Sequence, residues 1–347
     1  MFDKNGYLDF EFIFNNKMTY KFIVGGRGTG KTFGALKYVL DNNLKFIFMR
    51  RTQVQVDMIK SDELNPFNAL YTELGNKYHF VMKKINKNIT GVYKGKINDK
   101  NDYVATGEPL GYIMALSTIS NIRGFDASDV KVLIYDEFIG EKHEKSISSE
   151  GTAFLNAIET IARNRELKGA ESLKVVCLSN SNDLANPIFI ELKLVSICEK
   201  MIQKKLNYRN IPERELALFI VNDSPISKKK AETSLYKLSG TDSNFSRMSI
   251  KNEWTNEYMN LIASKNLINY RVLVKVGEIV IYENKNKRDF YVTEHASGTY
   301  DYYDTSAVEL KRFRNSYDFL LYAYLNKYIY FESYIEQVLF EKYIGIC

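Results

Sequence analysis

Residues that build disulfide frameworks and metal sites are scarce in this chain. Its 347 residues include three cysteines and three histidines, and no two cysteines form a Cys-x-x-Cys pair. A disulfide scaffold, a cysteine-rich zinc site and a histidine-based catalytic triad are therefore not expected. The low cysteine content predicts a protein of a reducing compartment.

Long apolar runs are also lacking. No stretch reaches the roughly 20 apolar residues that a bilayer-spanning helix needs. The opening segment, MFDKNGYLDF, contains acidic side chains and lacks the apolar core of a signal peptide. We therefore expect a soluble, cytoplasmic protein with no membrane partner.

The composition is that of a folded protein with a mild positive charge. Hydrophobic residues make up 45% and charged residues 26% of the chain, so material for buried cores is ample. The 48 Lys and Arg against 42 Asp and Glu give a net charge of +6. This balance suits a polyanionic partner but is also common in soluble enzymes. The length predicts two domains.

Alternating strand and helix patterns dominate the first part of the chain. The expected strands of the main sheet are residues 21–24, 45–49, 113–116, 130–135 and 174–178. Helical patterns at 31–40 and 62–74 follow the first two of them. This order predicts an α/β domain with a mainly parallel sheet.

A lysine-rich insertion interrupts this pattern. Three short antiparallel strands are expected at residues 78–82, 91–96 and 103–106, because Asn, Lys and Gly turns separate them. The lysines of this insertion are Lys83, Lys84, Lys87, Lys94, Lys96 and Lys100.

The residue pattern changes near residue 206, where a polar segment follows the alternating strands and helices. We expect a first domain at residues 1–206 and a linker region at 207–266, which contains the run Lys228–Lys230. Residues 267–347 hold three β-rich runs followed by helical patterning, which predicts a small α+β domain.

A phosphate-binding motif follows the first expected strand. Gly25-Gly26-Arg27-Gly28-Thr29-Gly30-Lys31-Thr32 fits GxxxxGK[ST] between a strand and a helix. Such a motif lets backbone N–H groups cradle the phosphates of ATP, while Lys31 neutralises their charge and the Thr32 hydroxyl binds Mg²⁺. The alternative is a glycine turn that binds no nucleotide.

A second motif supplies carboxylates. Residues 132–137, VLIYDE, are an apolar strand that ends in Asp136 and Glu137. Asp136 is expected to hold Mg²⁺ and Glu137 to polarise the water that attacks the γ-phosphate. The pair favours hydrolysis over phosphoryl transfer to a substrate hydroxyl. Taken alone, such a strand could also be purely structural.

Other positions carry weaker signals. Arg163 stands at the end of the helix after Asp136, where it could complete a neighbouring subunit's site or simply suit a helix C-terminus. Arg123 has the same ambiguity. Ser179 and Asn180 end a strand where a γ-phosphate sensor is expected, although a simple turn would explain them too. Residues 286–289 fit the guanine-reading NKxD motif, but a hairpin turn explains them better.

Taken in order, these stretches resemble a known family. VGGRGTGKT, IFMRR, VLIYDEFIGEK, ARNRE and CLSNSNDLANPIF resemble the genome-packaging motor ATPases of small podophages, which are related to the large terminase subunits of tailed phages. The match covers residues 20–190. It implies a RecA-like (ASCE) P-loop ATPase domain and a homomeric ring, commonly a pentamer. It also implies a place in the host cytoplasm and, transiently, at the portal vertex of an empty procapsid, where the ring translocates double-stranded DNA.

The resemblance also implies roles for single residues. Lys31 and Thr32 would bind the phosphates of ATP and Mg²⁺, and Asp136 and Glu137 would be the metal-binding and catalytic carboxylates. Arg163 would be the arginine that acts in trans. Arg123 falls where the family places another basic trans-acting residue. A structural packaging RNA joins the motor in part of the family, and the sequence leaves that partner open.

The family's C-terminal domain resembles an RNase H-type nuclease, which is degenerate in the small-podophage branch. A two-metal nuclease needs carboxylates on adjacent strands, and the first expected strand, YRVLVKV, offers Lys275 but no acid. Glu278, Glu283 and Glu294 remain as acids on or near the other strands. We expect an inactive nuclease fold, with an active one as the alternative.

DNA contacts in a motor should be electrostatic and independent of sequence. The candidates are the lysines of the insertion and Lys228–Lys230, each of which could equally be a solvated surface charge. Rival interpretations of the whole chain are a helicase or repair ATPase, a terminase that retains nuclease activity, and a nucleotide-gated assembly protein.

Overall fold

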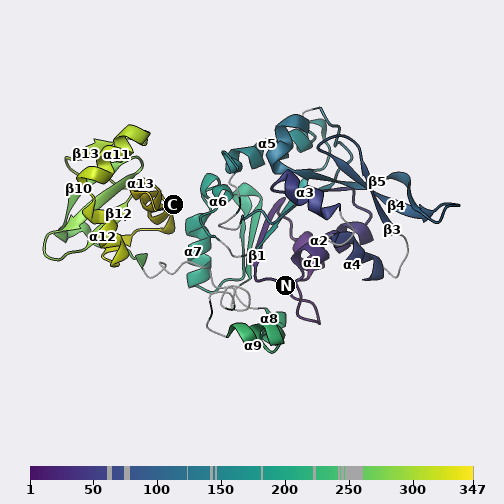
Figure 1. The fold of residues 1–347 in the computed structure, drawn as a ribbon, viewed down its shortest axis with the longest axis horizontal. Coiled ribbons are helices and arrows are strands. Elements are labelled where there is room, and N and C mark those ends of the chain that lie inside the picture. Colours follow the sequence, from purple (N-terminus) through teal and green to yellow (C-terminus); the bar gives the residue numbers. More distant parts are fainter. Residues whose placement is uncertain are drawn as a thin grey trace. The chain divides into compact units, whose positions relative to one another are not determined.

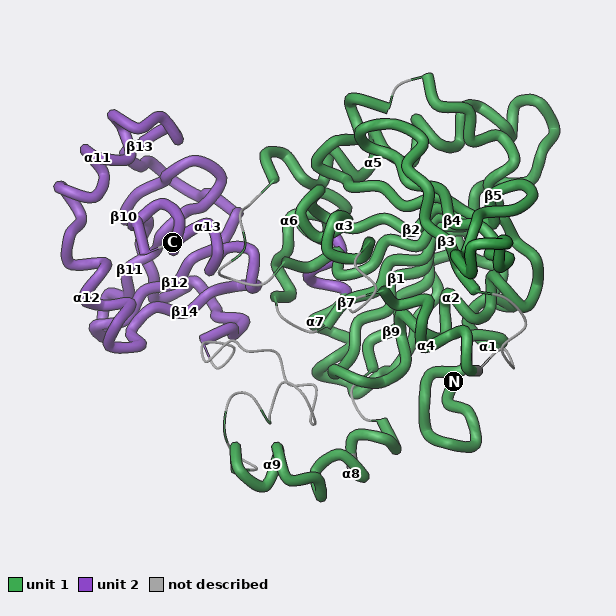
Figure 2. Tube along the Cα trace, turned by 45° about the vertical axis from the view of Figure 1, so that its right-hand side comes forward, with its two compact units in different colours: residues 1–192, 198–255 green, residues 193–197, 256–347 purple. Residues whose placement is uncertain are grey.

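The computed structural model divides the chain into two compact units (Figures 1 and 2). One comprises residues 1–192 and 198–255, and the other residues 193–197 and 256–347. The structure describes all residues except 61–64, 74–78, 123, 141–143, 145–146, 181–182, 222–223, 241–242, 244–245, 247–260 and 347. The side chains of Glu73 and Lys228 are also outside this description.

The first unit is built on a nine-stranded sheet with the order β3-β4-β5-β2-β6-β7-β1-β9-β8. Its parallel strands are β1 (Tyr20–Gly25), β2 (Phe46–Arg50), β5 (Tyr103–Ala115), β6 (Val132–Asp136), β7 (Lys174–Ser179) and β9 (Leu216–Val221). The antiparallel strands are β3 (His79–Lys84), β4 (Thr90–Ile97) and β8 (Tyr208–Ile211). The expected α/β domain with a mainly parallel sheet is confirmed.

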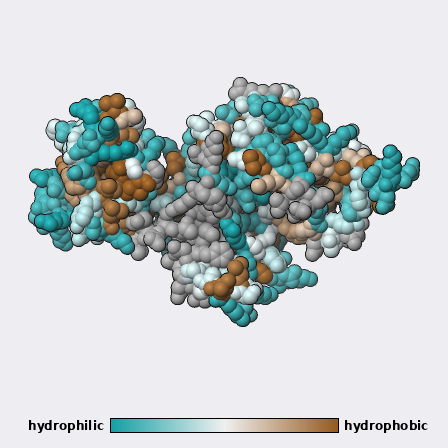
Figure 3. Space-filling view, in the orientation of Figure 1, coloured by the Kyte–Doolittle hydropathy of each residue, from teal (hydrophilic) through white to brown (hydrophobic). Residues whose placement is uncertain are grey.

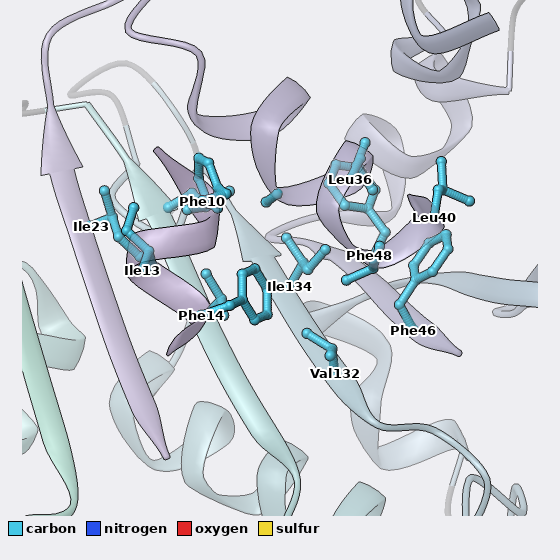
Figure 4. Packing of buried hydrophobic residues seen from close by; sticks show 14 of the residues in the cluster. Phe10, Ile13, Phe14, Ile23, Leu36, Leu40, Phe46, Phe48, Val132 and Ile134 are labelled. Carbon is cyan, nitrogen blue, oxygen red and sulfur yellow. The ribbon is translucent and has the colours of Figure 1, made fainter. Parts of the chain in front are cut away.

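Both faces of this sheet are covered, as continuous apolar strands such as VLIYD and LALFIV require. On one face, Ile23, Phe48 and Ile134 pack with residues from α1 (Phe10–Asn15) and α2 (Lys31–Asp41) (Figure 4). Residues from α3 (Gln53–Ile59) and α4 (Pro66–Glu73) belong to the same core. Successive strand residues point to opposite faces, so Phe22 faces the other side. There its ring lies 6.1 Å from that of Phe154 in α5 (Glu150–Ala162) and 5.6 Å from that of Phe189 in α6 (Pro187–Glu191).

The remaining helices of this part of the chain are short. They are α7 (Val195–Gln203), α8 (Pro225–Ala231), α9 (Ser234–Ser239) and the 3-10 turns η1 (Leu116–Ile122), η2 (Glu166–Lys168) and η3 (Pro212–Arg214). Among the described residues, no helix is both long enough and apolar enough to cross a membrane.

The insertion forms as a β-meander with one difference. The strands expected at 103–106 and 113–116 are a single long strand, β5, whose first part pairs with β4 and whose last part pairs with both β4 and β2. The lysines of the insertion are all exposed, and the tip of this meander is hydrophilic (Figure 3).

The boundary expected at residue 206 is wrong. β8 and β9 lie beyond it, and β9 pairs in parallel with β1 from Tyr20↔Leu216 to Gly25↔Val221. A strand that completes the buried sheet belongs to the first unit, which continues to residue 255. The predicted linker therefore contains sheet strands as well as α8 and α9.

The second unit is a small α+β domain, as expected. Its five-stranded sheet has the order β13-β10-β11-β12-β14, and the strands are β10 (Tyr270–Val276), β11 (Ile279–Asn284), β12 (Phe290–Thr293), β13 (Asp301–Tyr303) and β14 (Ile329–Phe331). The helices are η5 (Leu267–Asn269), α11 (Ala307–Ser316), α12 (Phe319–Leu325) and α13 (Tyr334–Ile344). Residues 286–289 lie in the β11–β12 turn, as the hairpin interpretation expects. The RNase H-like assignment stays a prediction.

Candidate active site

The sheet order brings the two predicted motifs together. β7 lies between β1 and β6, and all three are parallel. The carboxyl ends of parallel strands meet at one edge of a sheet, where α/β proteins bind their ligands. At this edge the structure has a cavity of about 390 Å³. Its lining residues are Arg27, Gly28, Gly30, Lys31, Thr32, Phe33, Asp136, Glu137, Ser179 and Asn180.

Three glycines of the P-loop are required by the local structure. Gly28 and Gly30 have φ values of +71° and +85°, in the left-handed region that glycine adopts without strain. A Cβ on Gly25 would lie 2.9 Å from Cβ of Val221 in β9. The loop turns directly into α2, which begins at Lys31. The Thr29 hydroxyl closes the loop by donating to the Gly26 carbonyl at 3.1 Å.

Lys31 is buried and lines the cavity. Its ammonium donates to the carbonyls of Gly25 at 2.9 Å and Gly26 at 2.8 Å, and to Oδ1 of Asn180 at 3.0 Å. The pKa of Lys31 is lowered to about 7, mainly by burial; Asp136 and Glu137 act against this shift, and the nearby cations Lys230 and Arg27 add to it. An anionic phosphate beside this ammonium would favour its charged form.

The side-chain oxygens of Thr32 and Asp136 lie side by side. The Thr32 hydroxyl lies 3.0 Å from each carboxylate oxygen of Asp136. Burial raises the pKa of Asp136, while Arg50, Thr32 and Lys31 act against that shift. Hydroxyl and carboxylate oxygens suit Mg²⁺, which is usually held by one or two carboxylates plus phosphates and water. In the described part of the chain, no three His, Cys, Asp or Glu residues cluster as a larger metal site.

Glu137 is the first residue beyond β6 and reaches into the same cavity. Its backbone has a φ of +54°, a conformation that costs a non-glycine residue on the order of 1 kcal/mol. About half of its side chain is exposed, and its carboxylate forms an ion pair with Nη1 of Arg50. The same nitrogen lies 3.6 Å from Oδ2 of Asp136.

The sequence alone assigned Arg50 no role of its own. β2 and β6 are neighbours, with Met49 opposite Tyr135, so the next position places Arg50 beside Asp136. The signal in the sequence was an arginine at the end of an apolar strand, but its meaning depends on which strands are adjacent. Arg50 places a positive charge between the two carboxylates.

Arg51 has a separate, structural position. It is 4% exposed and donates through Nε and Nη2 to the two carboxylate oxygens of Glu150, at 2.7 and 2.9 Å. Its Nη1 donates to Glu144 at 2.5 Å. This forked pairing attaches the end of β2 to the start of α5.

Asn180 and Ser179 lie where the sequence predicts them, at the end of β7. Asn180 accepts from Lys31, and the Ser179 hydroxyl accepts from the backbone N–H of Ile139 at 3.2 Å. Ser179 thus orders the segment after Glu137, while Asn180 faces Lys31.

The two arginines of the ARNRE segment have different environments. Arg165 is buried and donates to the carbonyls of Val130 at 2.6 Å and Ala127 at 3.1 Å, near the start of β6. Arg163 is exposed at the C-terminus of α5, with a φ of +46°. It therefore lies toward the opposite end of β6 from Asp136 and is not part of this subunit's cavity. Arg123 lies outside the described residues.

Lys230 lies at the P-loop. Its ammonium donates to the carbonyl of Arg27 at 2.5 Å, a contact that its place in the expected linker did not suggest. Lys229, its neighbour on α8, is exposed.

Comparison with known proteins identifies the family. Residues 2–311 match the podovirus DNA encapsidation protein family (Gp16). The chain is similar to the DNA packaging protein of Bacillus phage phi29, with 24% identity over 332 residues that cover 90% of this chain and 89% of that protein. It is also similar to the DNA packaging protein of Bacillus phage B103, with 24% identity over 300 residues that cover 84% and 82%.

Two solved structures share the fold along nearly the whole chain. The bacteriophage Phi-29 viral genome packaging motor assembly aligns with a TM-score of 0.64 and 19% identity, covering 97% of this chain and 99% of that one. The Phi-28 gp11 DNA packaging motor aligns with a TM-score of 0.61 and 19% identity, covering 98% of each chain. The resemblance drawn from residues 20–190 is thus confirmed and extended, and this chain belongs to the podovirus DNA encapsidation protein family.

Proposed function

We propose that this protein is an ATP-hydrolysing motor that translocates double-stranded viral DNA through the portal into a preformed capsid. The observation that carries the proposal is one cavity that joins Lys31 and Thr32 of the P-loop to Asp136 and Glu137. Family membership supports DNA as the substrate and the capsid as the destination, since similar proteins are named DNA packaging proteins.

The residues of the cavity have distinct tasks in hydrolysis. Lys31 and the loop N–H groups bind the phosphates, and Thr32 and Asp136 hold Mg²⁺, which neutralises charge on the phosphate oxygens when bound. Glu137 orients and polarises the attacking water. Asn180, in contact with Lys31, is suited to respond to the γ-phosphate.

The placement of Arg163 supports a shared site in a ring. Because Arg165 is occupied by backbone carbonyls, Arg163 is the arginine of this segment whose side chain is exposed. Its distance from its own Asp136 favours action on a neighbouring copy. The proposed assembly is a homomeric ring, commonly a pentamer in this family, and Arg123 is proposed as a second trans-acting residue.

The proposed DNA contacts are the exposed lysines of the β3–β5 meander, because sequence-independent grip needs exposed positive charge rather than base recognition. The proposed partners are double-stranded DNA, the portal and the procapsid, with a packaging RNA as a further candidate. The protein would act in the host cytoplasm and transiently at the portal vertex.

The second unit is proposed to be an inactive RNase H-like domain. Its first strand, β10, carries no acid, and Glu283 of β11 is paired with Arg271 at 2.8 Å. Among the described residues of this unit, no acidic cluster could hold a pair of metal ions.

ATP hydrolysis with and without double-stranded DNA tests the proposal. We expect DNA-stimulated turnover in the wild type, loss in Glu137→Gln and Arg163→Ala, and normal turnover in Lys168→Ala, which removes an exposed charge near Arg163. Mixing the two inactive variants should restore part of the activity, because an intact Glu137 can then meet an intact Arg163 from its neighbour.

Different outcomes would favour the rival functions. Turnover indifferent to DNA and retained in both variants would indicate a different P-loop protein. DNA unwinding without capsids would indicate a helicase or repair ATPase. Normal capsid assembly and packaging by Glu137→Gln would indicate a nucleotide-gated assembly protein.

A further inference from the structure

Two carbonyls of the P-loop accept hydrogen bonds from distant segments of the chain. Nζ of Lys230, in α8, donates to the Arg27 carbonyl at 2.5 Å. The backbone N–H of Leu8 donates to the Thr29 carbonyl at 3.0 Å. Neither donor residue lines the nucleotide cavity, so both hold the loop from its outer side.

These bonds set the direction of the neighbouring N–H groups. In a trans peptide the C=O and the following N–H point in opposite directions. A carbonyl of Arg27 that is held outward therefore turns the N–H of Gly28 toward the cavity, which Gly28 lines. Glycine allows this peptide to flip at little cost, so an external contact is needed to keep it in one orientation.

Lys230 approaches the loop closely. A Cβ on Gly28 would lie 2.6 Å from Nζ of Lys230, so a side chain at this position would displace the end of the lysine. The same ammonium lies 5.6 Å from the ring centre of Tyr236 in α9. The partly buried Lys230 therefore contacts both the loop and Tyr236 of α9.

The start of α8 is also fixed to the N-terminal segment. The buried Ser224 hydroxyl donates to the carbonyl of Gly6 at 3.2 Å, and a Cβ on Gly6 would lie 2.9 Å from Cβ of Pro225. After α9 the chain continues to the second unit, which resumes at residue 256. Helix α8 thus joins the P-loop to the segment that leads out of the ATPase unit.

We propose that Lys230 is a positioning residue for nucleotide binding: it orients the Arg27–Gly28 peptide toward the phosphates and couples phosphate binding to α8. The inference rests on the proposed ATP site. Coupling is reciprocal, so nucleotide should stabilise α8 as much as α8 stabilises the nucleotide-binding form of the loop. Lys230 also adds positive charge behind Arg27 and Lys31, which favours polyphosphates over uncharged ligands.

Binding of MgADP and of adenosine to the full chain, measured by calorimetry, tests the positioning role. Lys230→Met keeps the length of the side chain but removes its charge and donors. We expect it to weaken MgADP about tenfold and to leave adenosine unchanged, because one charge-assisted contact that orders the loop is lost. Lys230→Arg should recover part of the affinity. Lys229→Met, the same change on the same helix, should stay within about twofold of the wild type.

Hydrogen exchange tests the coupling. In the wild type, MgADP should slow amide exchange in residues 225–231, and in Lys230→Met it should not. The wild-type measurement alone decides the matter if the variant does not fold. Equal MgADP affinity in Lys230→Met and the wild type, an equal loss in Lys229→Met, or no protection of α8 would overturn the inference. Lys31→Ala separates the two proposals. Normal MgADP binding by Lys31→Ala would show that the proposed ATP site itself is wrong. Loss of MgADP binding in Lys31→Ala but not in Lys230→Met would overturn only the role of Lys230.

Discussion

Arg50, the last residue of β2, and Glu137, the first residue after β6, form an ion pair at the edge of the cavity, although they are 87 positions apart in the sequence (137 − 50). The guanidinium also lies 3.6 Å from the buried Asp136. Two adjacent carboxylates repel each other, and a shared cation lowers that repulsion. Arg50 therefore allows Asp136 and Glu137, the proposed metal-binding and catalytic carboxylates, to lie side by side.

We predict that Arg50→Ala lowers the rate of ATP hydrolysis at a given Mg²⁺ concentration by about tenfold to a hundredfold. Burial raises the pKa of Asp136, and Arg50 is the strongest group acting against that shift. Removal of the Arg50 guanidinium therefore disfavours the charged form of Asp136, which is the form that binds Mg²⁺. Hydrolysis rates across a Mg²⁺ titration would show a higher Mg²⁺ requirement. Arg50→Lys, which keeps the charge, should recover part of the rate. An unchanged Mg²⁺ titration in Arg50→Ala would contradict this role.

Local motifs made it predictable that the P-loop residues and Asp136 line one cavity. The glycines, Lys31 and Thr32 are contiguous, and an apolar strand that ends in Asp136 is typical of the metal-binding strand that accompanies a P-loop. The role of Arg50 could not be predicted, because it depends on the pairing of β2 with β6. The same holds for Lys230, whose partner Arg27 is about two hundred residues away along the chain.

The misplaced domain boundary has a similar cause. Residues 216–221 are a fully apolar run, but they stand between a polar turn and a lysine-rich helix. Their identity as a sheet strand comes from pairing with β1, a contact between segments far apart in sequence. Periodicity describes single elements and does not reveal which elements become neighbours.

The environment of Lys31 predicts a pH-dependent stability. Its pKa in the folded protein is about 7, mainly because of burial, whereas in the unfolded chain it is about 10.4. Between these values the unfolded chain binds more protons, so the free energy of unfolding rises with pH across this window. Below pH 7 both states are protonated and the cost of burying the charge is present in full.

Lys31→Met should therefore stabilise the nucleotide-free protein at pH 7, on the order of 1–3 kcal/mol, while it abolishes ATP binding. The difference in the free energy of unfolding between Lys31→Met and the wild type should be smaller at pH 9. Chemical denaturation at both pH values measures this. A variant that is less stable than the wild type at pH 7 would show that the hydrogen bonds of Lys31 outweigh the cost of burying its charge.

Substitutions of the two arginines of the ARNRE segment should have different effects, one on stability and the other on catalysis. Arg165→Ala removes donors from the buried carbonyls of Val130 and Ala127 and should destabilise the protein by about 2–4 kcal/mol. Arg163→Ala alters an exposed side chain and should change stability by less than about 0.5 kcal/mol. Thermal unfolding of both variants measures the contrast. Similar losses of stability in the two would argue against Arg163 as the residue available to a neighbour.

Removing one partner of the buried Arg51–Glu150 pair should destabilise the protein strongly, whereas replacing both partners by apolar residues should change its stability little. Arg51→Met leaves Glu150, which is 2% exposed, without its forked partner, and we expect a loss of about 3–5 kcal/mol in the free energy of unfolding. The double variant Arg51→Met/Glu150→Leu should regain most of that loss, because apolar residues of similar volume replace both charges.

Lys60→Met provides the matched control for Arg51→Met. It breaks the ion pair with Asp57 at 2.6 Å, in which both side chains are partly exposed, and such pairs contribute about 0–1 kcal/mol. If Arg51→Met cost no more than Lys60→Met, the contact between β2 and α5 would not depend on this pair. Glu144 also accepts from Arg51, at 2.5 Å, and loses this contact in both Arg51→Met and the double variant. If the double variant were as unstable as Arg51→Met, Glu144 would therefore be the more important partner of Arg51.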